Sequence, residues 1–143
     1  MVRQKNRVIY LHGGYIYHNS FQKSDIDADG VYRCYYYSHN EEEAEFLKNY
    51  CERLARETWG EVPQEYSSPV QPVNEFYRKN GVGTWWIQAT SIYPPKLEGV
   101  EDMQACCDMH GMDIAIKPVP FEGKFKKAIV LNLVSVEKPQ DVD

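Results

Sequence analysis

Aromatic and basic side chains occur close together at several points of this chain, and the two types suit the binding of a flexible, negatively charged polymer of flat rings. The aromatic candidates are Tyr35, Tyr37 and Trp86, and the basic candidates are Arg33, Lys124, Lys126 and Lys127. Aromatic rings stack on nucleobases at about 1–3 kcal/mol per base, while cationic groups contact the phosphates. The chemistry that we expect from these residues is non-covalent binding of single-stranded nucleic acid.

Each of these groups also has a purely structural interpretation. Tyr35 and Tyr37 lie in a tyrosine-rich segment, and tyrosine commonly fills half-buried positions of a strand. The three lysines would also solubilise an ordinary hairpin turn. Trp86 has the stronger claim to a binding role, because Trp85 beside it already supplies a large side chain for a core.

Residues 83–93 are predicted to form the central strand that positions Trp86. The segment is rich in aromatic and β-branched residues, and glycines precede it and two prolines follow it. Side chains alternate between the two faces of a strand. One face receives Trp85, Ile87 and Ala89, which suit a core. The other face receives Trp86, Gln88 and Thr90, so an indole lies among polar groups where a flat ligand can stack.

The remaining elements are predicted to surround this strand. Residues 7–18 predict a strand bent at two glycines, 31–37 a second strand, 112–121 an edge or bent strand, and 125–136 a last strand. A Glu-rich helix is predicted from about Asn40 to Gly60. This order predicts a mainly β fold with one helix (α+β): a five-stranded antiparallel oligonucleotide-binding (OB) barrel with the helix between the second and third strands. Other small α+β sheets have the same order of elements.

Length and charge suit one domain with a locally basic surface. A chain of 143 residues favours a single domain, here 1–138, followed by a short acidic tail, 139–143. The net charge is −5, and residues 40–65 account for it with eight acidic against three basic residues. The rest of the chain is balanced, which permits a basic face. With neither a secretory signal nor a membrane-spanning run, we expect a cytosolic protein.

Catalytic and metal-binding motifs are incomplete. Residues 10–14 look like the oxyanion loop of lipases and esterases, but the G-x-S-x-G nucleophile motif of that class does not occur. Cys107 and His110 have a spacing that a metal can use, without a second pair of comparable spacing. We therefore expect neither an enzyme nor a metal or other cofactor. Cys34 and Cys51 are expected to be buried, reduced thiols.

Three stretches together indicate a family. They are residues 29–33 with the Glu-rich helix through Tyr50 and Cys51, residues 80–89, and Lys117-Pro118-Val119-Pro120-Phe121 followed by the strand 126–136. In these features the chain resembles the single-stranded-DNA-binding proteins of short-tailed bacteriophages, a small replication and recombination group with an OB fold. The resemblance covers roughly residues 28–58 and 81–138.

The resemblance implies a protein that coats exposed DNA during phage replication and recombination in the cytoplasm of the infected bacterial host. It also implies a homodimer, and contacts with a polymerase or helicase through the acidic tail. By position, Phe121 would stack on a base at the strand bend. The alternative role for Phe121 is to cap the barrel. Trp86 and Gln88 stand where the family can place basic residues, and Arg3 and Lys5 match basic N-terminal residues.

The alternative function is a non-enzymatic protein-interaction or inhibitor module. In that interpretation the Glu-rich helix imitates the charge of nucleic acid, and the protein binds a host enzyme but no DNA. This alternative rests on the acidic stretch 40–65, the Glu-rich helix with the residues that follow it, which holds eight acidic against three basic residues.

Overall fold

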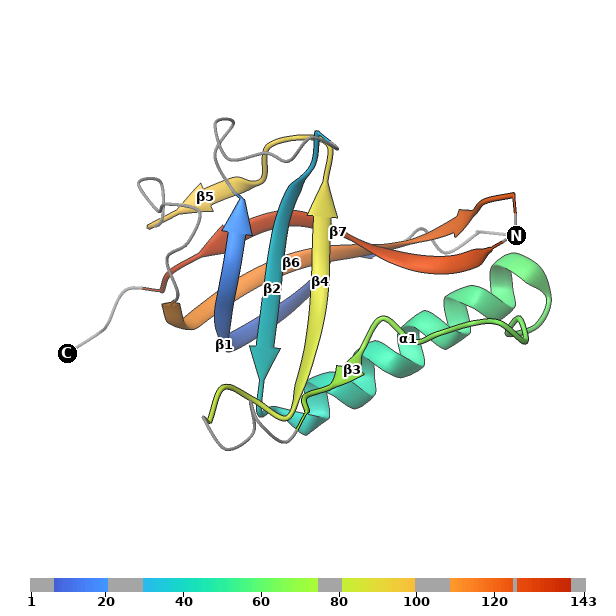
Figure 1. The fold of residues 1–143 in the computed structure, drawn as a ribbon, viewed down its shortest axis with the longest axis horizontal. Helices are drawn as coiled ribbons and strands as arrows, with labels where there is room; N and C mark the ends of the chain where they lie inside the picture. Colours follow the sequence, from blue (N-terminus) through green and yellow to red (C-terminus); the bar gives the residue numbers. More distant parts are fainter. Residues whose placement is uncertain (1–6, 21–29, 75–80, 100–108, 125, 140–143) are drawn as a thin grey trace.

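In the part of the chain that the structure describes, seven strands form one sheet, with a single helix beside it (Figure 1). The computed structural model describes residues 7–20, 30–74, 81–99, 109–124 and 126–139. In chain order the elements are β1 (Ile9–Ser20), β2 (Tyr32–Ser38), α1 (Glu41–Trp59), β3 (Gln71–Pro72), β4 (Trp85–Ser91), β5 (Lys96–Glu98), β6 (Met109–Glu122) and β7 (Lys127–Glu137). The predicted mainly β architecture is confirmed, and so is the position of the helix between the second and third strands.

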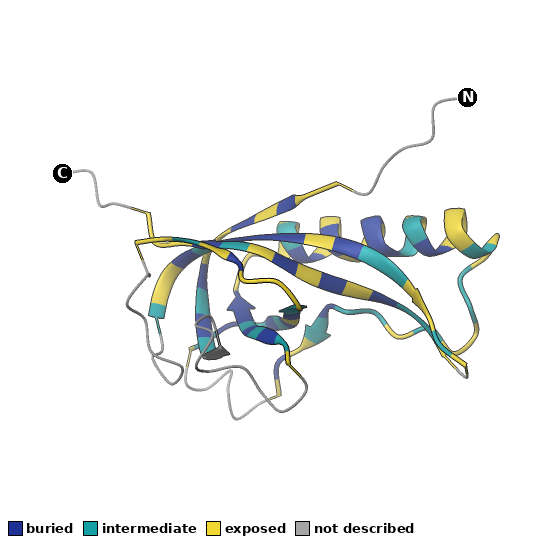
Figure 2. Cartoon of the chain, turned by 90° about the horizontal axis from the view of Figure 1, so that it is seen from above, coloured by how far each residue is buried: buried dark blue, intermediate teal, exposed yellow. Residues whose placement is uncertain are grey.

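The sheet has seven strands rather than five, because two short segments, β3 and β5, pair at its edges. The order is β3-β4-β2-β1-β6-β7-β5, and β4 pairs in addition with β7 through Thr90 and Asn132. The five longer strands, β4, β2, β1, β6 and β7, therefore follow one another in a closed circuit of pairings. Buried and exposed residues alternate along these strands (Figure 2), as expected where one face covers a core.

The core lies on the inner face of these strands and under α1. Trp85, Ile87 and Ala89 are all buried, as the alternation along the central strand predicts. Ile129, Leu131 and Leu133 of β7 are also buried, again as the sequence pattern predicts. The predicted burial of Cys34 and Cys51 is confirmed, and both are free thiols.

Helix α1 begins and ends at capping residues. The Asn40 side chain accepts a hydrogen bond from the Glu43 N–H at 3.1 Å, so Asn40 is the N-cap. Gly60 adopts a left-handed conformation at the other end, and its N–H donates to the Arg56 carbonyl at 2.8 Å. The apolar stripe of the helix is buried: Ala44, Leu47, Tyr50, Cys51 and Ala55.

Two irregular features of the strands agree with the sequence. The β1–β6 register shifts between Leu11 and Gly14, which confirms the predicted bend at the two glycines. Strand β6 runs through Pro118 and Pro120 and is longer than the predicted strand 112–121. Its pairing with β1 ends at Ile116, so both prolines lie where β6 has no partner on that side among the described residues, as in an edge strand.

The start of β4 is anchored to the end of β2 and to the first turn of α1. The Thr84 N–H donates to the Ser38 carbonyl at 2.8 Å, and the Thr84 hydroxyl donates to the Glu41 carboxylate at 2.7 Å. The Trp85 indole N–H donates to the Asn40 carbonyl at 2.9 Å. These bonds fix where β4 enters the sheet, and therefore which residue of β2 lies beside Trp86.

Some predicted features lie outside the described residues: Arg3, Lys5, Cys106, Cys107 and the tail beyond Pro139. In the ranges that are described, no helix combines the length and the apolar character needed to cross a membrane. No group of three or more metal-ligating side chains occurs in those ranges either.

Gly83 is expected to be needed for the junction between β2 and β4. A Cβ atom at this position would lie 2.8 Å from both the backbone nitrogen and the backbone oxygen of Ser38. We expect Gly83→Ala to lower the free energy of unfolding by about 3 kcal/mol, as severe overpacking does.

Gly81→Ala is the matched control, measured in the same urea denaturation series. Gly81 also has a positive φ, but a Cβ there meets no atom within 4 Å. Only the strain of the left-handed conformation remains, about 1–2 kcal/mol. Equal losses in the two variants would contradict the close approach of Gly83 to Ser38.

Candidate nucleic-acid interface

The registers of β1, β2 and β4 align outward side chains in rows across the sheet. Tyr37 pairs with Tyr15 on one side and with Trp86 on the other. The next row pairs Tyr35 with Tyr17 and with Gln88, and a third pairs Arg33 with Thr90. We call the five rings the aromatic face: Tyr15, Tyr17, Tyr35, Tyr37 and Trp86.

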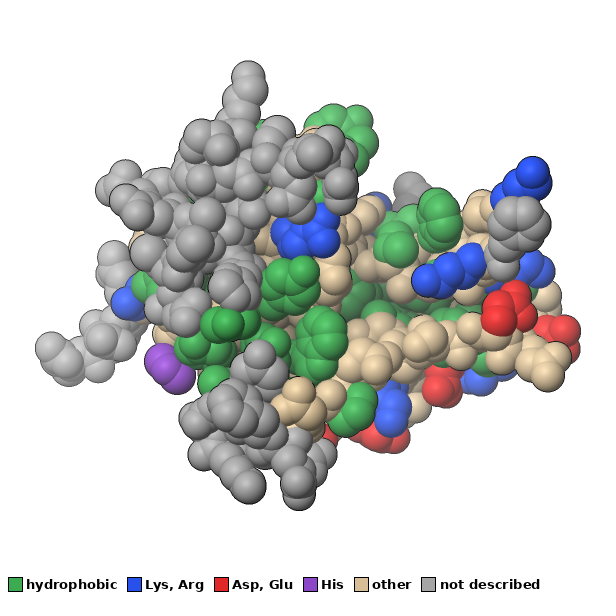
Figure 3. Space-filling view, viewed as in Figure 1, with side chains coloured by type: hydrophobic (Ala, Val, Ile, Leu, Met, Phe, Trp, Pro, Cys, Tyr) green, Lys and Arg blue, Asp and Glu red, His purple; other side chains and the backbone are tan. Residues whose placement is uncertain are grey.

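The rings of the aromatic face form one connected group. Centroids of neighbouring rings lie 6.1–6.4 Å apart, within the range of favourable aromatic pairs. Tyr37 and Trp86 are close to parallel, with an interplanar angle of 23°. His110 of β6 extends the group, because its ring lies 4.5 Å from the Tyr15 ring. Figure 3 shows hydrophobic side chains gathered over β1, β2 and β4, with basic side chains beside them.

The five rings differ in exposure and therefore in what they offer a ligand. Tyr15, Tyr17, Tyr35 and Trp86 are half-buried, so each presents part of its ring at the surface. Tyr37 is only 9% exposed and packs against Tyr15, Tyr17 and Trp86. Among the predicted stacking residues, Trp86 and Tyr35 are presented on the surface, while Tyr37 supports the rings around it.

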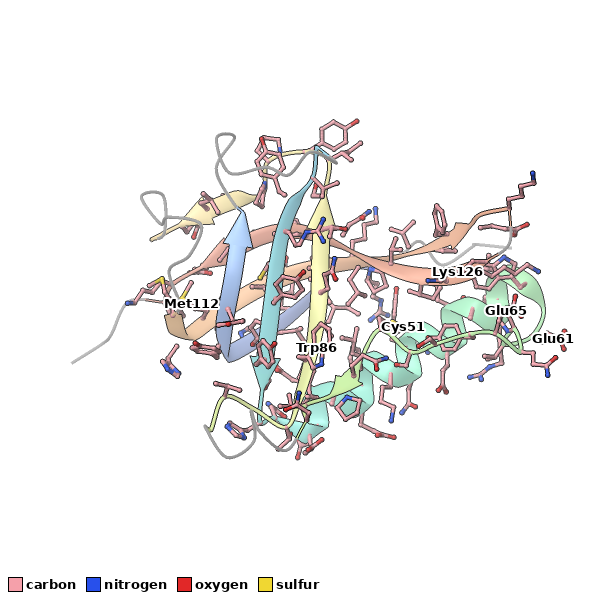
Figure 4. The ribbon with its side chains drawn as sticks, in the orientation of Figure 1. Cys51, Glu61, Glu65, Trp86, Met112 and Lys126 are labelled. Carbon is pink, nitrogen blue, oxygen red and sulfur yellow. The ribbon has the colours of Figure 1, made fainter. Side chains whose placement is uncertain are left out.

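A second group of predicted site residues lies on the β6–β7 hairpin. Phe121 is 50% exposed, which rules out the role of a barrel cap. Lys124 and Lys126 are exposed in the turn, which the Gly123 N–H closes by donating to the Lys126 carbonyl at 2.7 Å. Figure 4 shows Lys126 at the hairpin and Trp86 over β4, so the two groups come from different parts of the sheet.

Lys127 differs from the other two lysines, because it contacts the end of α1. Its Nζ lies 5.9 Å from the centroid of the Trp59 ring, and the Trp59 indole N–H donates to the Glu122 carboxylate at 2.8 Å. The hairpin is thus attached to the helix beside it. We conclude that the structure brings together Arg33, Tyr35, Tyr37, Trp86 and Gln88, and separately brings together Phe121, Lys124, Lys126 and Lys127.

Sequence reasoning missed three residues at this surface: Tyr15, Tyr17 and His110. The pattern Tyr15-Ile16-Tyr17 alternates as a strand does, with Ile16 buried between two outward tyrosines. This alternation is visible in the sequence, but it identifies the outer face of the sheet only once the pairing of β1 with β2 is known. His110 lies just before the predicted strand 112–121, whereas β6 begins at Met109.

An open pocket of about 380 Å³ adjoins the aromatic face at the bulge of β1. Tyr15 and Tyr37 belong to its lining, together with His39, His110 and the glycines at 13 and 81. The pocket therefore continues the row formed by Trp86, Tyr37 and Tyr15.

Several acidic side chains near this end of the sheet serve the fold. The Glu43 carboxylate accepts from the His12 N–H at 3.0 Å, and Asp113 accepts from the Gly13 N–H at 2.9 Å. Burial raises the pKa of the Glu43 carboxyl, while the hydrogen bond from His12 opposes that rise. Two first-turn acids of α1, Glu41 and Glu43, thus hold neighbouring strands in place.

Solved structures of phage proteins have similar folds. The single-stranded DNA-binding protein from bacteriophage Enc34 matches with a TM-score of 0.67 and 14% identity, over 94% of this chain and 82% of that one. The structure of that protein in complex with single-stranded DNA gives a TM-score of 0.64 and 17% identity, over 95% and 88%. The single-stranded DNA-binding protein gp2.5, encoded by bacteriophage T7, gives 0.57 and 14%, over 94% and 86%.

The likeness lies in the fold rather than in the sequence. No protein-family profile matches this chain, and none of the curated proteins matches it at a significant level. The resemblance drawn from the sequence is confirmed at the level of the fold, because each similar structure covers most of both chains. This chain has the fold of the single-stranded-DNA-binding proteins of phages.

Proposed function

We propose that this protein binds single-stranded DNA without sequence preference and protects exposed strands during phage DNA replication and recombination. The observation that carries the proposal is the aromatic face, a connected set of rings on the outer side of β1, β2 and β4. Every base has a π-face, so stacking on such a surface tolerates any sequence. The proposed role is binding and not catalysis.

The strand order supports an OB barrel with two added short strands. The circuit β1-β2-β4-β7-β6 joins five long strands, in which β2 and β4 are the second and third. OB folds bind oligonucleotides on the face of their second and third strands and through the loops after the first and fourth. Here those strands carry Tyr35 and Trp86, and the β6–β7 hairpin is the loop after the fourth strand of the barrel.

Phosphate contacts are assigned to residues at the edges of this surface. Arg33 follows the tyrosines on β2, and Lys124 and Lys126 lie exposed on the hairpin. A strand stacked on the aromatic face would reach Arg33 along β2 and the two lysines along β6 and β7. The acidic excess of the chain lies in residues 40–65, which form α1 and the segment after it, rather than on β2 and β4.

The similar structures support the choice of ligand and set its biological context. The Enc34 protein has been solved with single-stranded DNA, and both phage proteins are named for binding it. We extend the proposal to a single domain over residues 1–138, a homodimer, and contact with replication proteins through the acidic tail. The site of action would be the cytoplasm of the infected bacterial host.

Trp86→Ala is expected to weaken binding of oligo(dT) about tenfold, since one stacked base contributes roughly 1–3 kcal/mol. Fluorescence anisotropy of a labelled oligonucleotide measures the change, and Trp86→Tyr, which keeps a ring, should recover most of it. Phe46→Ala is the matched control, because Phe46 is an exposed aromatic residue of α1. An unchanged affinity of a folded Trp86→Ala protein would remove Trp86 from the site.

The salt dependence of binding tests the hairpin lysines. Each phosphate contact on a single strand contributes about −0.7 to the slope of log affinity against log salt. With roughly three to five contacts, the wild-type slope should be about −2 to −4.

We expect Lys126→Gln to make this slope less steep by about 0.7, because the variant makes one phosphate contact fewer and therefore releases fewer counterions. Lys48→Gln, which removes an exposed lysine from α1, should leave the slope unchanged. The titration is repeated at several salt concentrations with the same oligonucleotide. If both variants changed the slope equally, binding would depend on overall charge and not on the hairpin.

A further inference from the structure

The pocket beside the aromatic face is large enough to hold a small ligand, in addition to whatever stacks on the rings. Its volume of about 380 Å³ falls at the lower end of the range for small-molecule sites, about 300–1,000 Å³. We propose that it receives one nucleobase of the bound strand, turned out of the stacked row. This inference rests on the proposed binding of single-stranded DNA and assigns a separate site within it.

Glycines shape the pocket. Gly13 in the bulge of β1 and Gly81 before β4 both line it, and a Cβ added to either would meet no atom within 4 Å. Both have a φ of +73°, a backbone conformation that residues other than glycine, asparagine and aspartate rarely adopt. The backbone is therefore bare at two points of the lining, where a flat ring can approach it closely.

The chemistry of the lining favours a neutral ring over a phosphate. Tyr15 and Tyr37 belong to the lining, and its polar residues are Ser38, Asn40 and three histidines. Among the described residues that line the pocket there is no lysine, arginine, aspartate or glutamate. A base turned out of its stack is typically held by aromatic or apolar contacts and by hydrogen bonds to its edge, which such a lining supplies.

Hydrogen bonds within and around the lining hold these groups in place. The His39 Nε2 atom lies 3.0 Å from the Gly81 carbonyl, which joins two sides of the lining. The Asn40 side-chain oxygen caps α1, which leaves the amide NH₂ group as the hydrogen-bond donor of that side chain. His12 lies 3.3 Å from Asp113, whose other oxygen accepts from the Gly13 N–H. The site is thus preorganised before any strand binds.

The pocket is also continuous with the stacking surface. The Tyr15 ring contacts Tyr17 and Tyr37 on the aromatic face and lies 4.5 Å from His110 at the pocket. A strand stacked on Trp86 and Tyr15, with Tyr37 packed between these two rings, reaches the pocket that Tyr15 and Tyr37 also line. In the proposed arrangement the following base enters the pocket while its neighbours stay stacked on the aromatic face.

Gly81→Asn tests the proposal, because asparagine tolerates the left-handed conformation and places a side chain in the lining. Gly60→Asn is the matched control, since Gly60 has a similar φ of +83° and equally open surroundings at the end of α1. Each variant is titrated at low salt with oligo(dT) and with a strand of equal length made of abasic nucleotides. Thermal unfolding establishes that both variants fold.

We expect Gly81→Asn to weaken oligo(dT) binding at least about fivefold, the equivalent of one lost base contact. Gly60→Asn should bind as the wild type does, and all three proteins should bind the abasic strand equally. Val82→Phe narrows the pocket from another side and should reproduce the result, so the test does not depend on Gly81→Asn folding.

Other outcomes overturn the proposal. Equal oligo(dT) affinity of the two asparagine variants would mean that no base enters the pocket. An equal loss for oligo(dT) and the abasic strand would indicate a phosphate contact there instead. If the wild type bound neither strand, the proposed function itself would fail, and the pocket site with it; the wild-type titration separates that failure from the others.

Discussion

The antiparallel register between β2 and β4 determines which side chains meet on the outer face of the sheet. Tyr37 lies opposite Trp86 and Tyr35 opposite Gln88, while Tyr36 and Ile87 meet on the inner face. A shift by one residue would bury the outward set and expose the core set. The bonds from Thr84 to Ser38 and from Trp85 to Asn40 fix this register at one end of the pair. The candidate interface therefore depends on the same contacts that close the core.

Charge is distributed so that an acidic protein can still present a surface for a polyanion. The negative excess lies in residues 40–65, and two acids of the first turn of α1 are bound to neighbouring strands. The uncharged Trp86 and Gln88 leave the middle of the outer face without cations. In the proposed mode of binding, stacking supplies most of the affinity there, and cations act at the margins, on β2 and on the hairpin. The aromatic and electrostatic parts of the site are consequently separable by mutation.

Much of this arrangement follows from local sequence, and the rest depends on pairing. Alternation around Trp85 and Trp86 correctly assigns one tryptophan to the core, and Asn40 and Gly60 correctly mark the ends of α1. Tyr15 and Tyr17 were missed because the bulge at Gly13 and Gly14 shifts the register of β1, so its faces cannot be assigned from the sequence alone. His110 joins the surface only through the pairing of β6 with β1, which links residues about a hundred positions apart. The placement of Lys127 against Trp59 is likewise a tertiary contact that no local pattern reveals.

The most direct test follows the indole N–H signals of the three tryptophans by NMR during titration with oligo(dT). These side chains report on three places at once, because Trp86 lies on the aromatic face, Trp85 in the core and Trp59 beside the turn of the β6–β7 hairpin. We predict a large shift for Trp86, a smaller one for Trp59 and almost none for Trp85. An unmoved Trp86 signal, with the changes confined to amides of α1, would contradict binding on the aromatic face.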